Sequence, residues 1–478
     1  MSNPDRHGRR RPRPNDRSRP PRGRKGPARP PVEDAARQAA LDTVAAVRER
    51  DAYANLVLPG LLRERRISGR DAALATELAY GTCRARGLLD AVLDACSDRP
   101  FDQVDGPLQD VLRLGAYQLL RTRVPEHAAV STTVDLARAA VGSFAAGFVN
   151  AVMRRVLEHD EAGWVDRLAP DPERDAVGNL AFRHAHPRWI AQAFADALGD
   201  TGEELREALA ADDARPAVHL VARPGEVSAD ELAAMTGGDV APYSPYAVRL
   251  DAGAGDPADL EPVREQLAAV QDEGSQLTAL ALTRAPLTGS DQRWLDLCAG
   301  PGGKASLLGA LVGLDGGTLD AVEPSAHRAA LVRGVTAGLP VTVHEADGRA
   351  PELPAGSYDR VLVDAPCTGL GALRRRPEAR WRRQPSDLAA LARLQRELLT
   401  SALGLVRPGG VVAYVVCSPH LRETVEAVDD VLRGGGVEQL DARPAFPGVD
   451  QLGDGPHVQL WPHRHGTDAM FCALLRRS

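Results

Sequence analysis

A short apolar run followed by a glycine-rich turn, Trp294-Leu-Asp-Leu-Cys-Ala-Gly-Pro-Gly-Gly-Lys304, constrains the fold of this chain more than any other stretch. The run suits a strand that carries Asp296, and the pattern after the turn predicts a helix from about Ala305. The glycines let a ligand approach the backbone, and the first turn of a helix offers unpaired N–H groups. The stretch therefore indicates either a nucleotide-type pocket or an ordinary strand–helix turn.

Two common phosphate-binding motifs do not fit this turn. A P-loop requires Ser or Thr where the chain has Ala305, and Gly where it has Cys298. A dinucleotide fingerprint requires its third glycine at the position of Ala305. The interpretation that remains is a pocket for S-adenosylmethionine (SAM), with the turn beneath the methionine part and a later acid at the ribose.

Lys304 is unusual in this composition. Of 58 basic residues, only Lys25 and Lys304 are lysines, and the others are arginines. An ammonium group can shift its pKa and exchange a proton, whereas a guanidinium stays charged. A lysine at the pocket therefore indicates a functional role.

Length and composition indicate a globular protein. The 478 residues, 44% hydrophobic and 26% charged, suffice for two to four domains. No apolar run is long enough to span a membrane, and no secretory signal is recognisable. Six cysteines without a C-x-x-C pair and histidines without zinc spacing predict reduced thiols, a cytoplasmic location and no metal. We expect a monomer.

The first 30 residues differ from the rest in charge. They hold eleven basic and two acidic residues, whereas the whole chain has a net charge of −7. Their content of arginine, proline and glycine predicts a disordered basic tail over residues 1–30. Such a tail is either a non-specific nucleic-acid arm or a solvated extension without function.

Three folded regions are expected after the tail. Helical periodicity predicts an all-helical domain over residues 31–162, and mixed patterns predict a small α+β insert over residues 163–287. Regular βα alternation over residues 288–478 predicts a parallel doubly wound sheet with ligands at the carboxyl ends of its strands. The expected helices include Gly69–Arg86, Gly87–Ala95, Phe182–Leu198 and Ser228–Met235. The expected strands of the last region are Trp294–Leu297, Thr318–Val322, Val341–His344, Tyr358–Val363, Val411–Val416, and a hairpin of Val458–Trp461 with Met470–Leu475.

Acids and thiols follow these predicted strands. Glu323 follows the glycine turn at about the spacing of an acid that accepts from ribose hydroxyls. Asp347 follows the third strand, where it can accept from the adenine amino group. Asp364 and Cys367 follow the fourth strand and Cys417 the fifth. Because parallel strands end at one edge of a sheet, we expect these side chains to meet.

Two thiols beside a SAM pocket are typical of methyl transfer to a poor nucleophile such as carbon 5 of a pyrimidine. A thiolate that adds to carbon 6 makes carbon 5 reactive; a base then removes the carbon 5 proton and the thiolate leaves. Lys304 would help to form the thiolate, and Asp364 could hold the exocyclic amine and ring nitrogen of a cytosine. Either cysteine could instead be a small buried hydrophobic residue.

The segment Leu373–Arg383, between these cysteines, contains six arginines, one acid and one tryptophan. It predicts phosphate contacts with base stacking on the tryptophan, in a basic patch beside the cleft. The alternative, a solvated helix face, fits less well because Pro377 and Pro385 interrupt regular structure. The predicted RNA-binding residues are Arg374, Arg375, Arg376, Arg380 and Trp381.

Three motifs resemble those of the SAM-dependent RNA cytosine-C5 methyltransferases of the Nol/Nop/Sun family: Asp-Leu-Cys-Ala-Gly-Pro-Gly-Gly-Lys, Asp-Ala-Pro-Cys-Thr-Gly and Val-Cys-Ser. The segment Leu373–Trp381 is similar to their Arg-Arg-x-Pro-Asp-x-x-Trp segment. The helical region resembles a NusB-type RNA-binding domain, closed by Phe148–Arg155 as in the bacterial Sun/Fmu (RsmB) branch. The resemblance implies a NusB-like domain, a Rossmann-like SAM domain, and small-subunit (16S) rRNA, protein-free or partly assembled, as substrate.

The resemblance also implies roles for single residues. The family's nucleophile falls on Cys417, and its helper for product release falls on Cys367. Three positions depart from the family pattern: Gly300 replaces a usual Ala, Glu323 a usual Asp, and Val416 a usual Thr. The implied cofactor contacts are Cys298, Ala299, Gly300, Pro301, Gly302, Gly303, Lys304, Glu323, Asp347 and Asp364.

Other functions remain open. The enzyme could act on tRNA or DNA, or the chain could be a non-catalytic RNA-binding protein of the antitermination type. A DNA enzyme would use the Pro-Cys thiol and lack a nucleophile at Cys417, so the second thiol and the helical domain favour RNA. Intact Lys304, Asp364 and Cys367 favour an active enzyme.

Overall fold

The computed structural model describes residues 34–251 and 253–478. The predicted basic tail, residues 1–30, lies outside them. Residues 35–478 pack into one compact unit, so the three regions expected from the sequence share contacts. Within the described ranges, no helix is long and apolar enough to cross a membrane.

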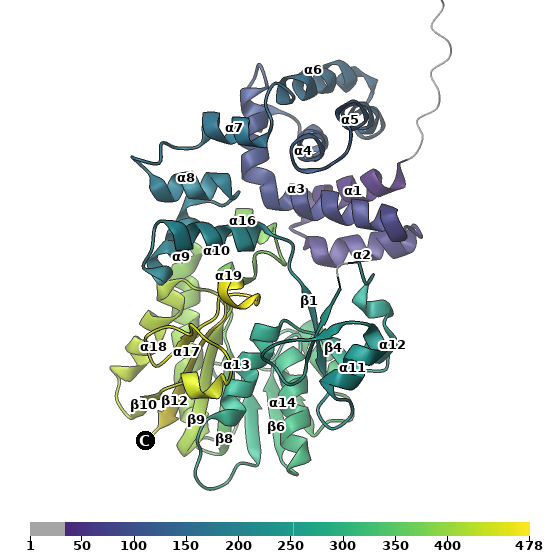
Figure 1. Cartoon of the computed structure of the whole chain (residues 1–478). Coiled ribbons are helices and arrows are strands. Elements are labelled where there is room, and N and C mark those ends of the chain that lie inside the picture. The colour runs from purple at the N-terminus through teal and green to yellow at the C-terminus, as the bar shows by residue number, and fades with distance from the viewer. Residues whose placement is uncertain (1–33, 252) are drawn as a thin grey trace, which may run out of the picture. The chain divides into compact units, whose positions relative to one another are not determined.

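The N-terminal region is all helical, as its periodicity predicts (Figure 1). Its helices share a core in which Leu78, Leu89 and Leu112 are fully buried. The predicted break between Gly69–Arg86 and Gly87–Ala95 is wrong, because one helix runs through Gly87. These helices are α1 (Ala35–Arg50), α2 (Ala54–Glu64), α3 (Gly69–Ala95), α4 (Gly106–Arg121), α5 (Glu126–Ala140) and α6 (Ala146–Val156).

Four further helices precede the first strand. The single helix predicted over Phe182–Leu198 is wrong, because the helix is interrupted between α8 (Ala176–Arg183) and α9 (Arg188–Leu198). Ala185 has a φ of 53°, and Pro187 stands immediately before α9. Proline lacks an N–H and restricts the residue before it, so a helix does not continue through this point. The four helices are α7 (Glu161–Leu168), α8 (Ala176–Arg183), α9 (Arg188–Leu198) and α10 (Glu203–Asp213).

A small antiparallel sheet forms the predicted α+β insert. Its strand order is β2-β3-β1-β4. Helix α11 (Ala229–Thr236) begins at the predicted cap, where Ser228 and Glu231 each accept from the other's backbone N–H in a capping box. The strands are β1 (Val218–Ala222), β2 (Asp239–Val240), β3 (Ala247–Leu250) and β4 (Ala268–Val270), and the short helix α12 (Glu261–Arg264) lies between the last two.

The large sheet has the order β10-β12-β9-β8-β5-β6-β7, with β11 paired to β12. The five strands from β9 to β7 are parallel, which confirms the predicted βα alternation, whereas β12 and β10 pair antiparallel. The predicted terminal hairpin is present as β11 and β12, but β10 was not predicted. The strands are β5 (Arg293–Asp296), β6 (Thr318–Val322), β7 (Val341–His344), β8 (Tyr358–Asp364), β9 (Val406–Val416), β10 (Val437–Leu440), β11 (Val458–Gln459) and β12 (Phe471–Arg477).

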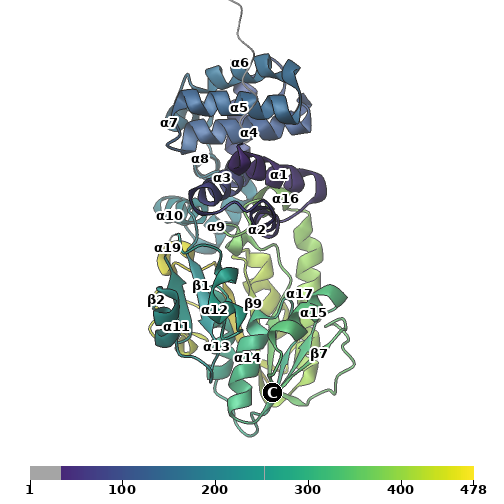
Figure 2. The ribbon, with the colours of Figure 1, turned by 90° about the vertical axis from the view of Figure 1, so that its right-hand side faces the viewer.

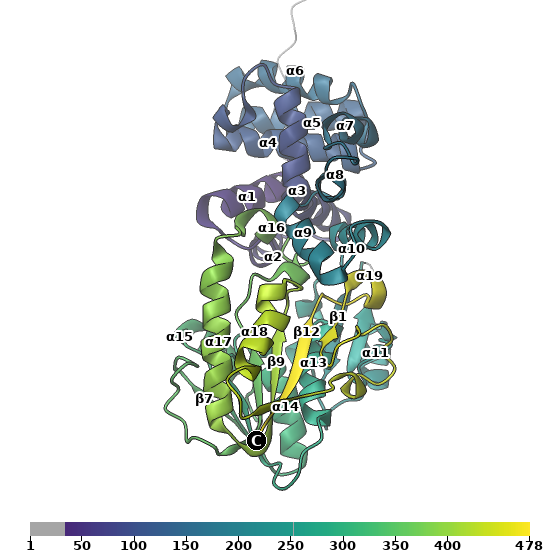
Figure 3. The ribbon, with the colours of Figure 1, turned by 90° about the vertical axis from the view of Figure 1, so that its left-hand side faces the viewer.

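Helices cover both faces of this sheet (Figures 1 and 3). Because side chains alternate along a strand, Ala413 and Val415 of β9 join the core under α13 and α14, whereas Val412 and Tyr414 join the core under α17 and α18. Helix α15 packs beside the edge strand β7 (Figure 2). The helices are α13 (Glu273–Arg284), α14 (Gly303–Leu314), α15 (Ala326–Val335), α17 (Asp387–Leu405) and α18 (Val425–Leu432).

Candidate active site

The glycine turn joins the end of β5 to the start of α14, as the sequence predicts. Gly302 has a φ of 116°, which an L side chain rarely adopts, and a Cβ there would lie 2.4 Å from Cγ2 of Val335. Gly300 lies against Glu323: a Cβ on Gly300 would lie 2.2 Å from Oε2 of that acid. The turn is therefore packed closely against the residue that follows β6.

Glu323 is buried, with 2% of its surface exposed. Its Oε1 accepts from the backbone N–H of Ser325 at 3.0 Å, and its Oε2 lies 3.2 Å from the guanidinium of Arg328. Arg328 also donates to the carbonyl oxygen of Gly300. The predicted ribose acceptor thus lies at the glycine turn, held by a helix terminus and an arginine.

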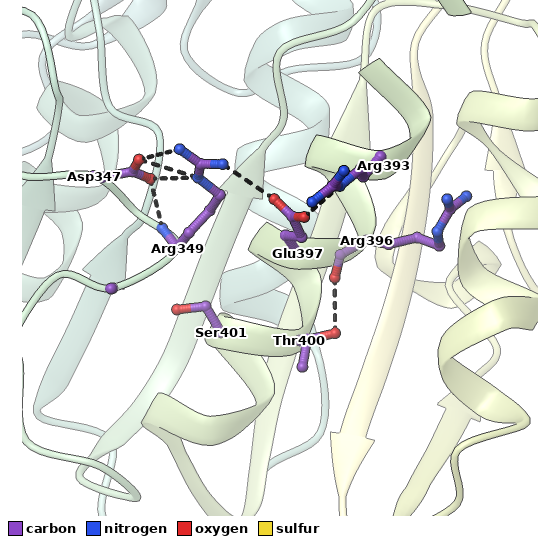
Figure 4. Close-up of a pocket in the computed structure, with 8 residues that line it drawn as sticks. Asp347, Arg349, Arg393, Arg396, Glu397, Thr400 and Ser401 are labelled. Atoms are coloured by element: carbon purple, nitrogen blue, oxygen red, sulfur yellow. Dashed lines mark hydrogen bonds and ion pairs between the residues drawn. The ribbon is translucent and has the colours of Figure 1, made fainter. Parts of the chain in front are cut away.

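Asp347 lies farther along the same edge, in the loop after β7. The neighbouring Gly348 packs on the end of β5, where a Cβ would lie 2.8 Å from the carbonyl oxygen of Leu297. The guanidinium of Arg349 binds Asp347 and lowers the pKa of its carboxyl, and it also contacts Glu397 (Figure 4). These residues line an open pocket of about 750 Å³ between the loop and α17.

A lysine and two acids meet at the ends of β5 and β8. Nζ of Lys304 donates to Oδ2 of Asp364 at 2.8 Å. Burial acts to lower the pKa of Lys304, but the facing carboxylate of Asp364 reverses the effect and raises it. Burial, with the charge of Asp364, raises the pKa of Asp296 to about 7. Oδ2 of Asp296 is buried and has no hydrogen-bond partner within the described residues.

The two predicted thiols are in contact. Sγ of Cys367 lies 3.5 Å from Sγ of Cys417, and the N–H of Gly371 ties the two loops by donating to the carbonyl of Cys417 at 2.9 Å. The hydrogen bond from Cys367 lowers the pKa of Cys417 against the opposing effect of burial, and the charge of Lys304 lowers it further. The same contact, followed by burial, raises the pKa of Cys367. Cys417 is therefore the thiol that ionises more readily.

The structure corrects the expected role of the arginine-rich segment. Arg374 is buried and donates to Asp468 at 2.8 Å, and Arg375 binds both Asp468 and Asp272. These ion pairs join the segment to the approach to β12 and to the N-terminus of α13. Arg374 and Arg375 therefore connect parts of the protein rather than present an open phosphate-binding patch.

Arg380 and Trp381 are also engaged internally. Arg380 is fully buried, and its Nη2 donates to Oδ2 of Asp212 at 2.8 Å. The indole of Trp381 donates to the carbonyl of Cys83 in α3 at 3.0 Å. Of the five predicted RNA-binding residues, Arg376 alone is exposed among the described residues. The prediction of base stacking on Trp381 conflicts with this packing.

Behind the thiols lies a buried carboxylate, that of Glu423, which was not among the predicted site residues. Glu423 accepts hydrogen bonds from Thr368 and Ser418, the residues that follow the two cysteines. An acid six positions after Cys417 was the signal in the sequence, but nothing local marked it as buried.

The parallel sheet ends in a glycine turn and an acid-lined edge, where such sheets bind their ligands, and is extended by antiparallel strands. This arrangement fits a methyltransferase of the SAM-dependent class. The family model described as "16S rRNA methyltransferase RsmB/F" matches residues 285–476, and that of the NusB family matches residues 34–158. The chain belongs to the RsmB/F family of 16S rRNA methyltransferases and carries the NusB domain, so the predicted resemblance and fold class are confirmed.

Individual proteins agree with this assignment. A Mycobacterium tuberculosis (strain H37Rv) protein whose name marks it as a candidate methyltransferase is 63% identical, over 96% of this chain and 99% of its own length. The ribosomal RNA small subunit methyltransferase B of Pseudomonas putida is 34% identical, over 92% of this chain and 98% of its own length. The crystal structure of PH0851 has a TM-score of 0.77 at 20% identity, covers 93% of this chain and 99% of its own, and shows the same fold.

Proposed function

We propose that this methyltransferase modifies carbon 5 of a cytosine in small-subunit (16S) rRNA, with Cys417 adding covalently to carbon 6. The observation that carries the proposal is the 3.5 Å contact between Cys417 and Cys367 at the ends of two adjacent parallel strands. Transfer to nitrogen or oxygen needs no thiol, whereas carbon 5 becomes nucleophilic only after a thiolate adds to carbon 6.

The residues at the turn fit SAM, which supplies an electrophilic methyl group when bound. Residues 298–304 and Glu323 would hold it, and Asp347 would accept from its adenine. Oδ2 of Asp296 supports this fit, because a buried carboxylate oxygen without a partner calls for a donor, and SAM carries an ammonium group. Two acids beside one lysine also suit a cationic ligand.

The other groups have separable roles. Lys304 lowers the pKa of the Cys417 thiol and holds the carboxylate of Asp364. Asp364 ends β8, the strand beside β9, and Cys417 follows β9. Asp364 would accept from the exocyclic amine of cytosine. Cys367, whose thiol ionises less readily than that of Cys417, acts later, when the methylated base is released.

The RNA substrate rests on the NusB domain and on the chemistry of carbon 6. A ring attacked face-on has to leave its base stack, which costs least in a loop or an unfolded strand. We therefore expect protein-free or partly assembled small-subunit RNA to react faster than mature subunits. Bisulfite sequencing of total RNA from a strain that lacks the gene would separate 16S rRNA from tRNA as the target.

The covalent step is tested with the two cysteine variants. Cys417→Ala should abolish methylation and form no RNA adduct. Cys367→Ala should still add Cys417 to carbon 6 and accept the methyl group, then stall before release. This variant should give a SAM-dependent protein–RNA complex that survives denaturing electrophoresis and contains the labelled methyl group, and the double variant should lose it.

Other outcomes would overturn parts of the proposal. A trapped complex with Cys417→Ala but not Cys367→Ala would exchange the two roles, as in an enzyme that uses the Pro-Cys thiol. Full methylation by Cys417→Ala would exclude a covalent route through Cys417.

A further inference from the structure

Behind the two thiols, the side chain of Glu423 links the loops that carry them. Glu423 is fully buried and lies in the short helical turn Leu421–Glu423 that follows Cys417. Its Oε1 accepts from the backbone N–H of Thr368 at 2.8 Å. Its Oε2 accepts from the hydroxyl of Ser418 at 2.7 Å and from the hydroxyl of Thr368. One carboxylate thus binds the residue after Cys367 and the residue after Cys417.

The hydrogen bonds of Glu423 to Thr368 and Ser418 form a clamp on the two loops. A second buried side chain extends this clamp to the residue before Cys367. Nε2 of Gln395, in α17, donates to the carbonyl of Pro366 at 2.9 Å and to Oε1 of Glu423 at 3.1 Å. The residues before and after Cys367 are therefore both held. Gln395 and Ser418 are fully buried, so water does not compete for these hydrogen bonds.

The turn that carries Glu423 is attached to β9, an interior strand of the large sheet. Tyr414 of β9 donates its hydroxyl to the carbonyl of Glu423 at 2.7 Å, which fixes the turn against the sheet. Four hydrogen-bond donors around one carboxylate compensate for the cost of burying its charge. Such a network is expensive to leave partly formed, so it favours a single arrangement of the two loops.

We propose that Glu423 is a positioning residue that holds the Cys367 and Cys417 loops with their sulfur atoms in contact. The inference rests on the proposed function for its catalytic consequence, but the positioning can be measured without RNA. Thiols held at this separation should form a disulfide readily with diamide, a diazene oxidant. The two thiols give up two hydrogens and become the disulfide, and the diazene takes up those hydrogens and becomes a hydrazine.

The matched variants are Glu423→Ala and Glu423→Gln in the full chain. Glutamine keeps an oxygen for the N–H of Thr368 and offers an N–H to the two hydroxyls, which can rotate to accept it. It also removes the negative charge, so it separates position from charge. Alanine removes all of the side-chain hydrogen bonds and keeps the bond from Tyr414 to the backbone carbonyl. The rate of the Cys367–Cys417 disulfide is followed by peptide mass spectrometry, with thermal unfolding as the folding control.

Glu423→Ala should form this disulfide about tenfold or more slowly, because small displacements of reacting groups are costly, while Glu423→Gln stays within about threefold of the native rate. Single-turnover methylation should follow the same order, with SAM affinity unchanged in both variants. Equal crosslinking rates in the native protein and Glu423→Ala would overturn the positioning role. Altered crosslinking in a protein that never methylates RNA would instead contradict the proposed function alone.

Glu423→Ala leaves several buried donors unpaired and could prevent folding. Ser418→Ala then supplies the test, because it removes the hydroxyl that links Glu423 to the residue after Cys417 and leaves the other three donors to Glu423 in place. It also removes the acceptor of the His420 N–H, so thermal unfolding is measured for this variant too. The variant should slow the disulfide several-fold in a folded protein, and a native rate would overturn the inference.

Discussion

Gly300 and Glu323 fit together at the glycine turn: a Cβ on Gly300 would lie 2.2 Å from Oε2 of Glu323. In the resemblance drawn from the sequence, these two positions depart from a usual alanine and a usual aspartate. The missing methyl group therefore makes room for an acid that is longer by one methylene. We therefore expect the two departures to compensate each other.

This pairing predicts that Glu323→Asp has opposite effects on SAM affinity in the native protein and in the Gly300→Ala variant, as measured by titration calorimetry. Gly300→Ala should weaken binding about tenfold or more, because the new methyl group displaces Glu323 or the turn. Glu323→Asp in that background should restore most of the loss, whereas Glu323→Asp alone should weaken binding. Losses that simply add in the double variant would show that the two positions are independent.

The buried carboxyl of Asp296 should lower the free energy of unfolding increasingly as the pH rises. The pKa of its buried carboxyl is raised to about 7, above the value of about 3.9 in an unfolded chain. The stabilising protonation is therefore fully present below about pH 4 and is lost as the pH rises through about 7. Asp296→Asn removes this cost, so its gain in the free energy of unfolding should grow over this range, by up to about 4 kcal/mol.

Urea unfolding of both proteins without SAM, at several pH values, measures this difference. The same variant should bind SAM less tightly, since it replaces a carboxylate, which suits a cationic ligand, with an uncharged amide. A stability difference that does not change with pH would show that Asp296 is ionised in the folded protein at acid pH.

The parts of the fold that local pattern sets were predictable. The strands Thr318–Val322 and Val341–His344 have the predicted bounds, and Ser228 caps its helix, because alternation and capping are read from neighbouring residues. The edge that collects the acids and thiols follows from the parallel topology. Pro187 was a signal in the sequence for a helix break, but the helical periodicity on both sides of it led to the prediction of one continuous helix.

The arginine-rich segment could not be predicted in this way. Its charge pattern indicates a solvent-exposed patch, but the partners that bury Arg380 and Arg374 are Asp212 and Asp468. They lie far away in the sequence, so only the tertiary fold reveals them. Glu423 was missed for the same reason, because its burial depends on Thr368 and Gln395.

Replacing Arg380 should therefore affect mainly stability, whereas replacing Arg376 should affect mainly RNA affinity. Arg380→Met leaves the buried Asp212 without its arginine and should lower the free energy of unfolding by about 3 kcal/mol or more, with little change in RNA affinity of the folded protein. Arg376→Ala should leave stability nearly unchanged and weaken RNA binding. Its dependence of log affinity on log salt should fall by about 0.7 to 0.9, one phosphate contact. Equal RNA affinities for Arg376→Ala and the native protein would leave the segment without a role in binding RNA.

The indole of Trp381 holds the same segment on the helical domain and packs against Gly87 of α3. A Cβ on Gly87 would lie 2.2 Å from Cη2 of the indole. Alanine in place of a helical glycine normally stabilises by about 0.5–1 kcal/mol, and this is expected for Gly60→Ala in α2, where a Cβ would meet nothing within 4 Å among the described residues. Gly87→Ala should instead destabilise by about 1–3 kcal/mol, because the indole cannot move without losing its hydrogen bond to Cys83.

The test is a double-mutant cycle in urea unfolding. Trp381→Ala alone should lower the free energy of unfolding by about 2–4 kcal/mol, since the side chain is partly buried. In that background the obstacle is gone, so Gly87→Ala should become stabilising, like Gly60→Ala. If Gly87→Ala destabilises equally with and without the indole, the contact between α3 and Trp381 does not hold the segment. A change of Gly87→Ala from destabilising to stabilising would instead establish that glycine is needed here because the indole lies directly against its Cα, and not because the helix is broken at this point.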